Sequence, residues 1–166
     1  MTNSHPNGVR IDDAAVGSAG LSDAWEAPIL GRMGLDDNTA IDLLRAHDIQ
    51  PSAQRVAVAR YVLTTTEHPS ADQVFSRVRG KGANVSRATV YNTLHLFTQK
   101  GLLKELVLAP GRTVFDPCTT PHHHFIDDET GRIHDVAWES LAVEHVDALP
   151  DFAIDDYQVV LHGRKR

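Results

Sequence analysis

The sequence predicts an α+β protein in which an N-terminal helical domain with a β-hairpin precedes a small α/β domain. Apolar residues recur at helical spacing between residues 36 and 100, and after Gly101 they alternate as they do in strands. The charge divides along the chain as well. Residues 45–104 hold nine Lys or Arg against three acids, whereas the whole chain carries −6. A basic island between acidic neighbours is typical of a nucleic-acid-binding module joined to a different kind of domain.

The length of 166 residues allows two small domains. Residues 1–34 carry scattered Gly, Pro, Ser and Asp without a sustained period, and we expect them to form a flexible N-terminal arm. The change of pattern then divides the rest into a DNA-binding domain at residues 35–117 and a second domain at residues 118–166.

The composition, 42% hydrophobic and 23% charged, is that of a soluble globular protein. No apolar run approaches the roughly 18 residues of a membrane span, and the N-terminus lacks the layout of a secretory signal. We therefore expect a cytoplasmic protein without a membrane partner. The single cysteine, Cys118, excludes an internal disulfide framework and a zinc site built on cysteine pairs.

Four helices are predicted in the first domain, each beginning at an Asp or Ser that can cap it. Their expected ranges are 36–47, 52–64, 70–80 and 86–100. After Gly101, residues 102–108 and 113–116 alternate around a turn that contains Pro110 and Gly111, which predicts a β-hairpin. Short helices followed by a hairpin are the layout of a winged helix-turn-helix, in which the fourth helix enters the major groove of DNA.

The outward face of the fourth helix favours contact with DNA. Tyr91 and Ala88 suit apolar contact with thymine methyl groups, and Arg87 and Asn92 suit base edges or phosphates. An ordinary amphipathic helix is the alternative. The candidate DNA-binding residues are Arg55, Ser86, Arg87, Thr89, Tyr91 and Asn92.

In the second domain we expect strands at residues 123–127 and 132–136, a helix at 137–147 and a last strand at 154–161. An exposed sheet edge there favours pairing with a second copy. The resulting homodimer has the two-fold symmetry that a palindromic or near-palindromic operator in double-stranded DNA requires.

Three consecutive histidines, His122, His123 and His124, are a dense supply of ligands for a metal or a heme. A short histidine run can equally be a solvated feature of a loop. On a strand, alternation directs His122 and His124 to one face and His123 to the other.

Four segments together resemble the ferric uptake regulator family, over roughly residues 40–163. They are Ser86–Leu94, His68–Ala71, Val114–Asp116 and His122-x-His124. The triple histidine is most similar to the iron response regulator branch of that family. The resemblance implies a dimeric winged-helix transcription regulator that senses a metal.

The resemblance also implies a metal site, and this chain holds a plausible ligand at every position of it. The predicted ligands are His68, Asp116, His122, His124 and Asp135. Such nitrogen and oxygen donors suit Fe(II), Mn(II) or Zn(II). Two other family sites are lost: Asp127 and Thr130 stand where a structural Cys-x-x-Cys pair would fall, and a third site has Tyr157 in place of its histidine and Ala142 in place of an acid.

The iron response regulator resemblance implies heme as a second effector, with His122, His123 and His124 as candidate axial ligands. For His123 the alternative is a plain surface histidine. We therefore expect an iron- and heme-responsive repressor or activator that controls genes for iron homeostasis and heme biosynthesis. A peroxide-sensing or Mn-, Fe- or Zn-responsive repressor is the alternative. A metal-dependent hydrolase is disfavoured because no nucleophile or general base can be assigned, so we do not expect an enzyme.

Overall fold

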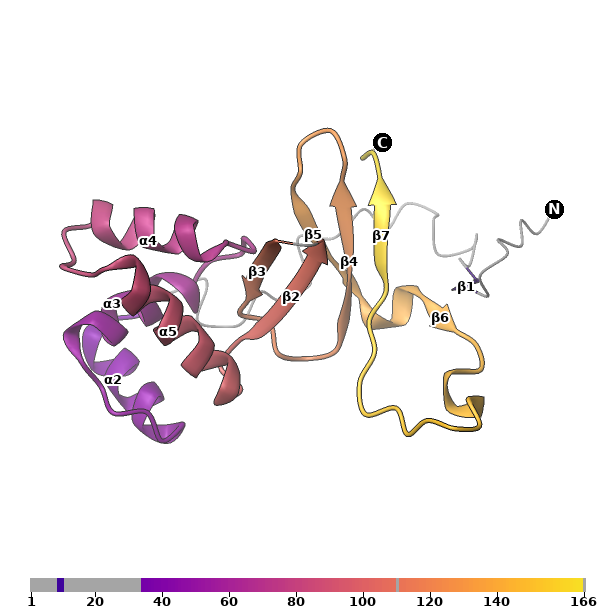
Figure 1. Ribbon diagram of the computed structural model, residues 1–166, viewed down its shortest axis with the longest axis horizontal. Coiled ribbons are helices and arrows are strands. Elements are labelled where there is room, and N and C mark those ends of the chain that lie inside the picture. The colour runs from indigo at the N-terminus through magenta and orange to yellow at the C-terminus, as the bar shows by residue number, and fades with distance from the viewer. Residues whose placement is uncertain (1–8, 11–33, 110, 166) are drawn as a thin grey trace. The chain divides into compact units, whose positions relative to one another are not determined.

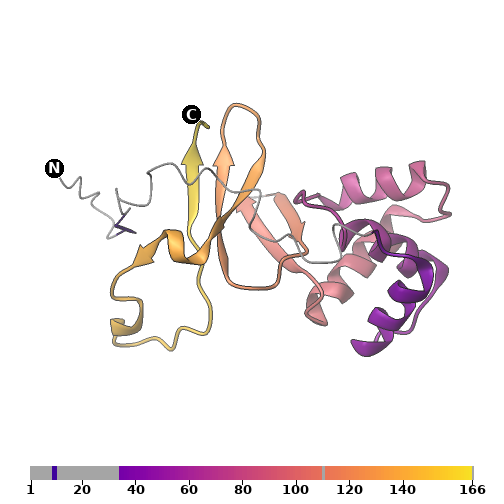
Figure 2. The same cartoon turned by 180° about the vertical axis from the view of Figure 1, so that it is seen from behind.

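The computed structural model describes residues 9–10, 34–109 and 111–165, so the arm predicted at residues 1–34 lies outside the described residues except for Val9, Arg10 and Gly34. The described chain divides into two compact units, with the boundary between Thr119 and Thr120. We call residues 34–119 the helical unit. Residues 120–165, together with Val9 and Arg10, are the strand unit (Figures 1 and 2).

The helical unit contains the four predicted helices, which confirms that part of the prediction. They are α2 (Asp37–Ala46), α3 (Ala53–Val62), α4 (Ala71–Gly80) and α5 (Arg87–Gln99). Each helix starts after a side chain that accepts a backbone N–H from the first turn, and these caps are Asp36, Ser52, Ser70 and Ser86. At α4 the Gln73 side chain reciprocates by accepting the Ser70 N–H, which completes a capping box.

The core of the helical unit is formed by apolar side chains of all four helices. Val90, Leu94 and Phe97 are fully buried on one face of this helix, among apolar residues of the other three helices. Packing against α3 and α4 holds α5 in place and leaves its opposite face outward. No helix among the described residues is long and apolar enough to cross a membrane.

The predicted hairpin is present as β2 (Lys104–Ala109) and β3 (Arg112–Asp116), paired antiparallel with Lys104 opposite Asp116. Its position is set by a backbone hydrogen bond, in which the Phe115 N–H donates to the Pro69 carbonyl at 2.9 Å. The Phe115 ring is buried in the helical core. Strand β3 is therefore tied to the loop that leads into α4.

The strand unit is built around β4 (His122–Asp127). Strand β5 (Ile133–Ala137) pairs with it antiparallel on one side, and β7 (Val160–Gly163) pairs parallel on the other. A separate two-stranded pair joins β1 (Val9–Arg10) to β6 (Ala142–Val143). The predicted positions of β4 and β5 are confirmed to within a residue.

The helix predicted at residues 137–147 is wrong. That segment forms 3-10 turns at Trp138–Ser140 and Val146–Ala148, with β6 between them. Pairing of β6 with β1 takes residues 142–143 into extended backbone, and a local helical pattern cannot compete with such a tertiary contact. The last strand also begins later than predicted, at Val160, where pairing with His124 starts.

The turn between β4 and β5 is closed by Asp127. Its Oδ2 accepts the Thr130 hydroxyl at 2.7 Å and its Oδ1 accepts the Glu129 N–H at 3.0 Å. These hydrogen bonds lower the pKa of Asp127, the Thr130 bond most of all. Asp127 and Thr130, which stand where the family has its cysteine pair, are thus joined by a hydrogen bond.

Because its pKa is lower in the folded state, Asp127 stabilises the protein above the ordinary carboxyl pKa of about 3.9, and this contribution is lost as pH falls through the folded-state pKa. We expect the free energy of unfolding of Asp127→Asn to fall less steeply than that of the unsubstituted chain as the pH becomes acidic. Urea unfolding at a series of pH values from neutral to acidic measures this. Asp128→Asn is the matched control, since Asp128 is an exposed neighbour that pairs with His162. An equally steep fall for Asp127→Asn would contradict this role.

Candidate metal centre and DNA-contacting helix

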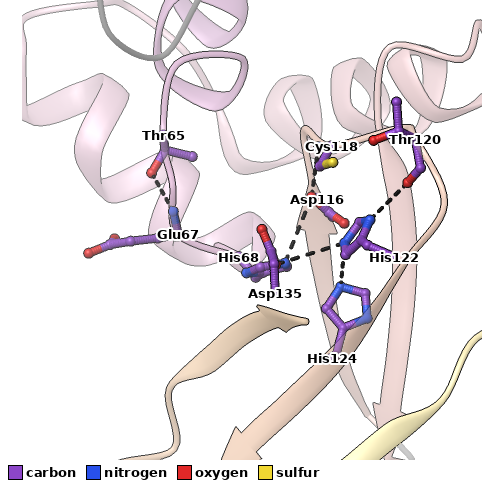
Figure 3. Close-up of polar contacts among 9 residues, drawn as sticks. All are labelled: Thr65, Glu67, His68, Asp116, Cys118, Thr120, His122, His124 and Asp135. Carbon is purple, nitrogen blue, oxygen red and sulfur yellow. Dashed lines mark hydrogen bonds and ion pairs between the residues drawn. The ribbon is translucent and has the colours of Figure 1, made fainter. Parts of the chain in front are cut away.

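His122 and His124 form the centre of a buried cluster in the strand unit. Alternation along β4 places both rings on one face, and their Nε2 atoms are 2.9 Å apart. Both side chains are buried. On β5, Asp135 lies opposite His124 in register, and its Oδ1 is 3.8 Å from the His122 Nε2 (Figure 3).

The tautomer of His122 follows from its second nitrogen. His122 Nδ1 is 2.8 Å from the Thr120 carbonyl oxygen (Figure 3). A carbonyl only accepts, so Nδ1 carries the proton and the lone pair of Nε2 is directed at His124. A metal-binding histidine is commonly oriented in this way by a hydrogen bond at its other nitrogen.

The cluster suits a divalent cation by distance and by chemistry. The candidate ligand atoms of His122, His124 and Asp135 lie within 4.8 Å of one another. Bonds of about 2.0–2.2 Å to a common ion require ligand atoms about 3–4.4 Å apart, so small side-chain movements are sufficient. Imidazole nitrogen with carboxylate oxygen is a donor set for Fe(II), Mn(II) or Zn(II).

The other two predicted ligands lie in the helical unit. His68 stands in the loop before α4, and its Nε2 is 3.8 Å from Oδ1 of Asp116, the last residue of β3. Both side chains are almost fully buried. The Cys118 N–H donates to the same Asp116 oxygen at 2.7 Å (Figure 3). The hydrogen bond between Phe115 and Pro69 brings the two segments together.

His123 lies on the opposite face of β4, as alternation predicts, but the alternative of a surface histidine is wrong because only 1% of the residue is exposed. Its ring stacks on Trp138 with centroids 4.6 Å apart, and Nδ1 accepts the Val159 N–H at 3.2 Å. Burial, followed by the charges of neighbouring histidines, lowers its pKa. Trp138 and Tyr157 pack their rings against each other beside His123, and no pattern in the sequence related either residue to it.

We expect His124→Ala to weaken Mn(II) binding at least about 100-fold, because losing even a supporting partner of a metal ligand costs about 10- to 100-fold. His162→Ala is the matched control, since it removes an exposed imidazole from the adjacent strand β7. Isothermal titration calorimetry measures both affinities. Equal affinities for the two variants would exclude His124 from the site.

On α5 the structure separates a buried face from an outward face. Ser86 and Thr89 are joined at the start of the helix, since the Ser86 Oγ accepts the Thr89 N–H at 3.0 Å. Farther along, Tyr91 is 60% exposed and Asn92 is also exposed. A large aromatic ring with this exposure is available to a partner.

Arg55, in the first turn of α3, lies beside this outward face. With Thr89 and Asn92 it lines a hollow of about 340 Å³ between α3 and α5. Its Nη1 donates to the Gln50 carbonyl at 2.6 Å, which holds the guanidinium in place. Arg87, another predicted DNA-binding residue, forms an ion pair with Asp72 that the sequence did not predict.

We expect Tyr91→Ala to weaken binding to the operator by roughly 5- to 160-fold, since a lost base contact costs about 1–3 kcal/mol. Tyr91→Phe is the control, because it keeps the apolar ring and removes only the hydroxyl. Fluorescence anisotropy with a labelled duplex measures both. If both variants bind as tightly as the unsubstituted chain, Tyr91 does not read DNA.

Comparison with known proteins gives consistent results. The model of the "Ferric uptake regulator family" matches residues 47–162. The peroxide operon regulator of Bacillus subtilis (strain 168) is 32% identical over 126 residues, which are 75% of this chain and 87% of that protein. The manganese-containing ferric uptake regulator of Pseudomonas aeruginosa is similar in structure, with a TM-score of 0.60, 24% identity and coverage of 80% of this chain and 99% of the other. The Vibrio cholerae ferric uptake regulator is similar in structure as well, with a TM-score of 0.63 and 20% identity. The similarity covers 75% of this chain and 98% of the other. These likenesses confirm the predicted fold class, a winged helix-turn-helix domain followed by an α/β dimerisation domain.

Proposed function

This chain belongs to the ferric uptake regulator family, and from that membership we propose that it is a metal-dependent repressor whose DNA binding is released by peroxide. Members of the family are DNA-binding transcription regulators rather than enzymes, and they act as dimers. Divalent manganese, iron or zinc is the cofactor in family structures. The target is a palindromic or near-palindromic operator that matches the symmetry of the dimer.

The observation that supports this proposal most strongly is the buried pair of His122 and His124, in which the Nε2 lone pair of His122 is directed at the His124 Nε2. We propose that one ion takes ligands from this pair and Asp135 and also from His68 and Asp116 of the helical unit. An ion with ligands in both units stabilises one arrangement of the units over others. Metal occupancy then changes DNA affinity through the placement of α5.

The donor set supports a response to peroxide. Fe(II) held by imidazole and carboxylate ligands would supply the redox activity that activates hydrogen peroxide. In the net reaction hydrogen peroxide is the two-electron oxidant: a ring carbon of a ligand histidine exchanges its C–H bond for a bond to one peroxide oxygen, and the other oxygen leaves as water. A ring altered in this way binds the ion less well, so the metal-bound arrangement loses its stabilisation and DNA is released.

The test compares the chain loaded with Fe(II) and with Mn(II), bound to an operator selected from a random duplex library. After hydrogen peroxide, we expect the Fe(II) form to release DNA and to gain an oxygen atom on His68, His122 or His124, as mapped by peptide mass spectrometry. The Mn(II) form should keep both its DNA and its mass. The exposed His162 serves as the internal control for random oxidation. If the Fe(II) form keeps its DNA after peroxide and no oxygen is found on these histidines, the proposal is wrong.

The second candidate is an iron- and heme-responsive repressor of the iron response regulator branch, controlling genes for iron homeostasis and heme biosynthesis. The run of three histidines favours it, with His122, His123 and His124 as heme ligands. All three side chains are buried, so heme iron can reach an imidazole only after the residues that cover these histidines move. Heme titration followed by absorbance and gel shift discriminates between the two. Release of DNA by heme but not by peroxide would favour this second function.

A further inference from the structure

Arg87, the first residue of α5, is held by two residues of α4. Its guanidinium forms an ion pair with Asp72, and the guanidinium carbon lies 4.8 Å from the centroid of the Phe75 ring. The pair is open to solvent, with 66% of the Arg87 side chain and 77% of the Asp72 side chain exposed. The Arg87 guanidinium is therefore directed at α4.

The surroundings of Arg87 fit an anion. Arg79 also lies over the Phe75 ring, at 5.7 Å from its centroid. These three side chains, together with Ser86, line an open hollow of about 580 Å³ at the start of α5. Within the first turn of α5 there is no acidic residue. Asp72 is thus the carboxylate that stands between this pair of arginines and an incoming anion.

We propose that Arg87 contacts a DNA phosphate rather than a base, and that Asp72 is a positioning residue that competes with this phosphate for the guanidinium. This inference rests on the proposed function, since it requires duplex DNA at α5. A guanidinium offers a planar fork of donors that fits either a carboxylate or a phosphate. Stacking on Phe75 keeps that fork near the hollow in both states, so the phosphate replaces Asp72 without a large movement of Arg87.

The competition has a defined consequence. A phosphate contact contributes to binding of any duplex, whatever its sequence. Asp72 therefore lowers the affinity for specific and non-specific DNA by the same factor. An exposed ion pair is weak, so this factor is about two- to fivefold.

The experiment uses the full-length chain loaded with Mn(II) and a labelled mixed-sequence duplex of about 30 base pairs, titrated over a range of KCl concentrations. Asp72→Asn should bind about two- to fivefold more tightly than the unsubstituted chain. Asp42→Asn is the matched control: Asp42 pairs with Arg45 on α2 and is 77% exposed, as Asp72 is. It changes the net charge equally and leaves Arg87 paired. Asp72→Glu keeps the charge and should retain the original affinity.

The dependence on Arg87 separates competition from a structural effect. Arg87→Ala should weaken binding and reduce the slope of log K against log[KCl] by about one. In that background, Asp72→Asn should add nothing beyond Asp42→Asn. Thermal unfolding of each variant verifies that the fold is kept.

The outcomes distinguish the two proposals. If Asp72→Asn binds no more tightly than Asp42→Asn, or if its gain persists without Arg87, the competition does not exist although the chain still binds DNA. If the unsubstituted chain binds no duplex at any salt concentration, the proposed function fails, and this inference fails with it.

Discussion

The strand unit depends on the two-residue repeat of β4. Because neighbours on a strand face opposite sides of the sheet, three consecutive histidines are divided between two environments. His122 and His124 meet each other and Asp135 on one side. On the other side His123 packs against Trp138 and accepts a backbone N–H from the segment before β7. One short strand thus holds a polar cluster and an aromatic one at the same level of the sheet.

In the helical unit, a comparable constraint is the backbone hydrogen bond between Phe115 and Pro69. It joins the end of the hairpin to the loop before α4, two places that are distant in sequence. His68 and Asp116 each stand next to one end of this bond, and their proximity follows from it. The same loop leads into the capping box of α4, so the location of this buried pair is set by local backbone geometry rather than by the side chains themselves.

Local signals were sufficient to predict the helical unit. Capping residues marked the starts of the helices, and the spacing of Val90, Leu94 and Phe97 identified the buried face of α5. The prediction failed at residues 137–147, where pairing of β6 with β1 and the stacking of Trp138 involve partners remote in sequence. The family resemblance was needed to combine His68 with the histidines of β4, because spacing alone cannot relate residues in two different units.

The pairing of Arg87 with Asp72 was not predictable from the pattern on α5 either. A helical wheel assigns a residue to a face of its own helix and contains no information about the neighbouring helix. Arg87 is outward on α5, as expected, yet the first turn of α4 lies close enough to engage it.

The turn closed by Asp127 and Thr130 has a consequence for how this domain depends on zinc. Where a structural zinc ion holds a turn of this kind, a chelator that removes the ion destabilises the domain. Here a hydroxyl and a backbone N–H satisfy the carboxylate instead. The β4–β5 turn therefore keeps its shape under chelation, and a shortage of zinc does not by itself dismantle it.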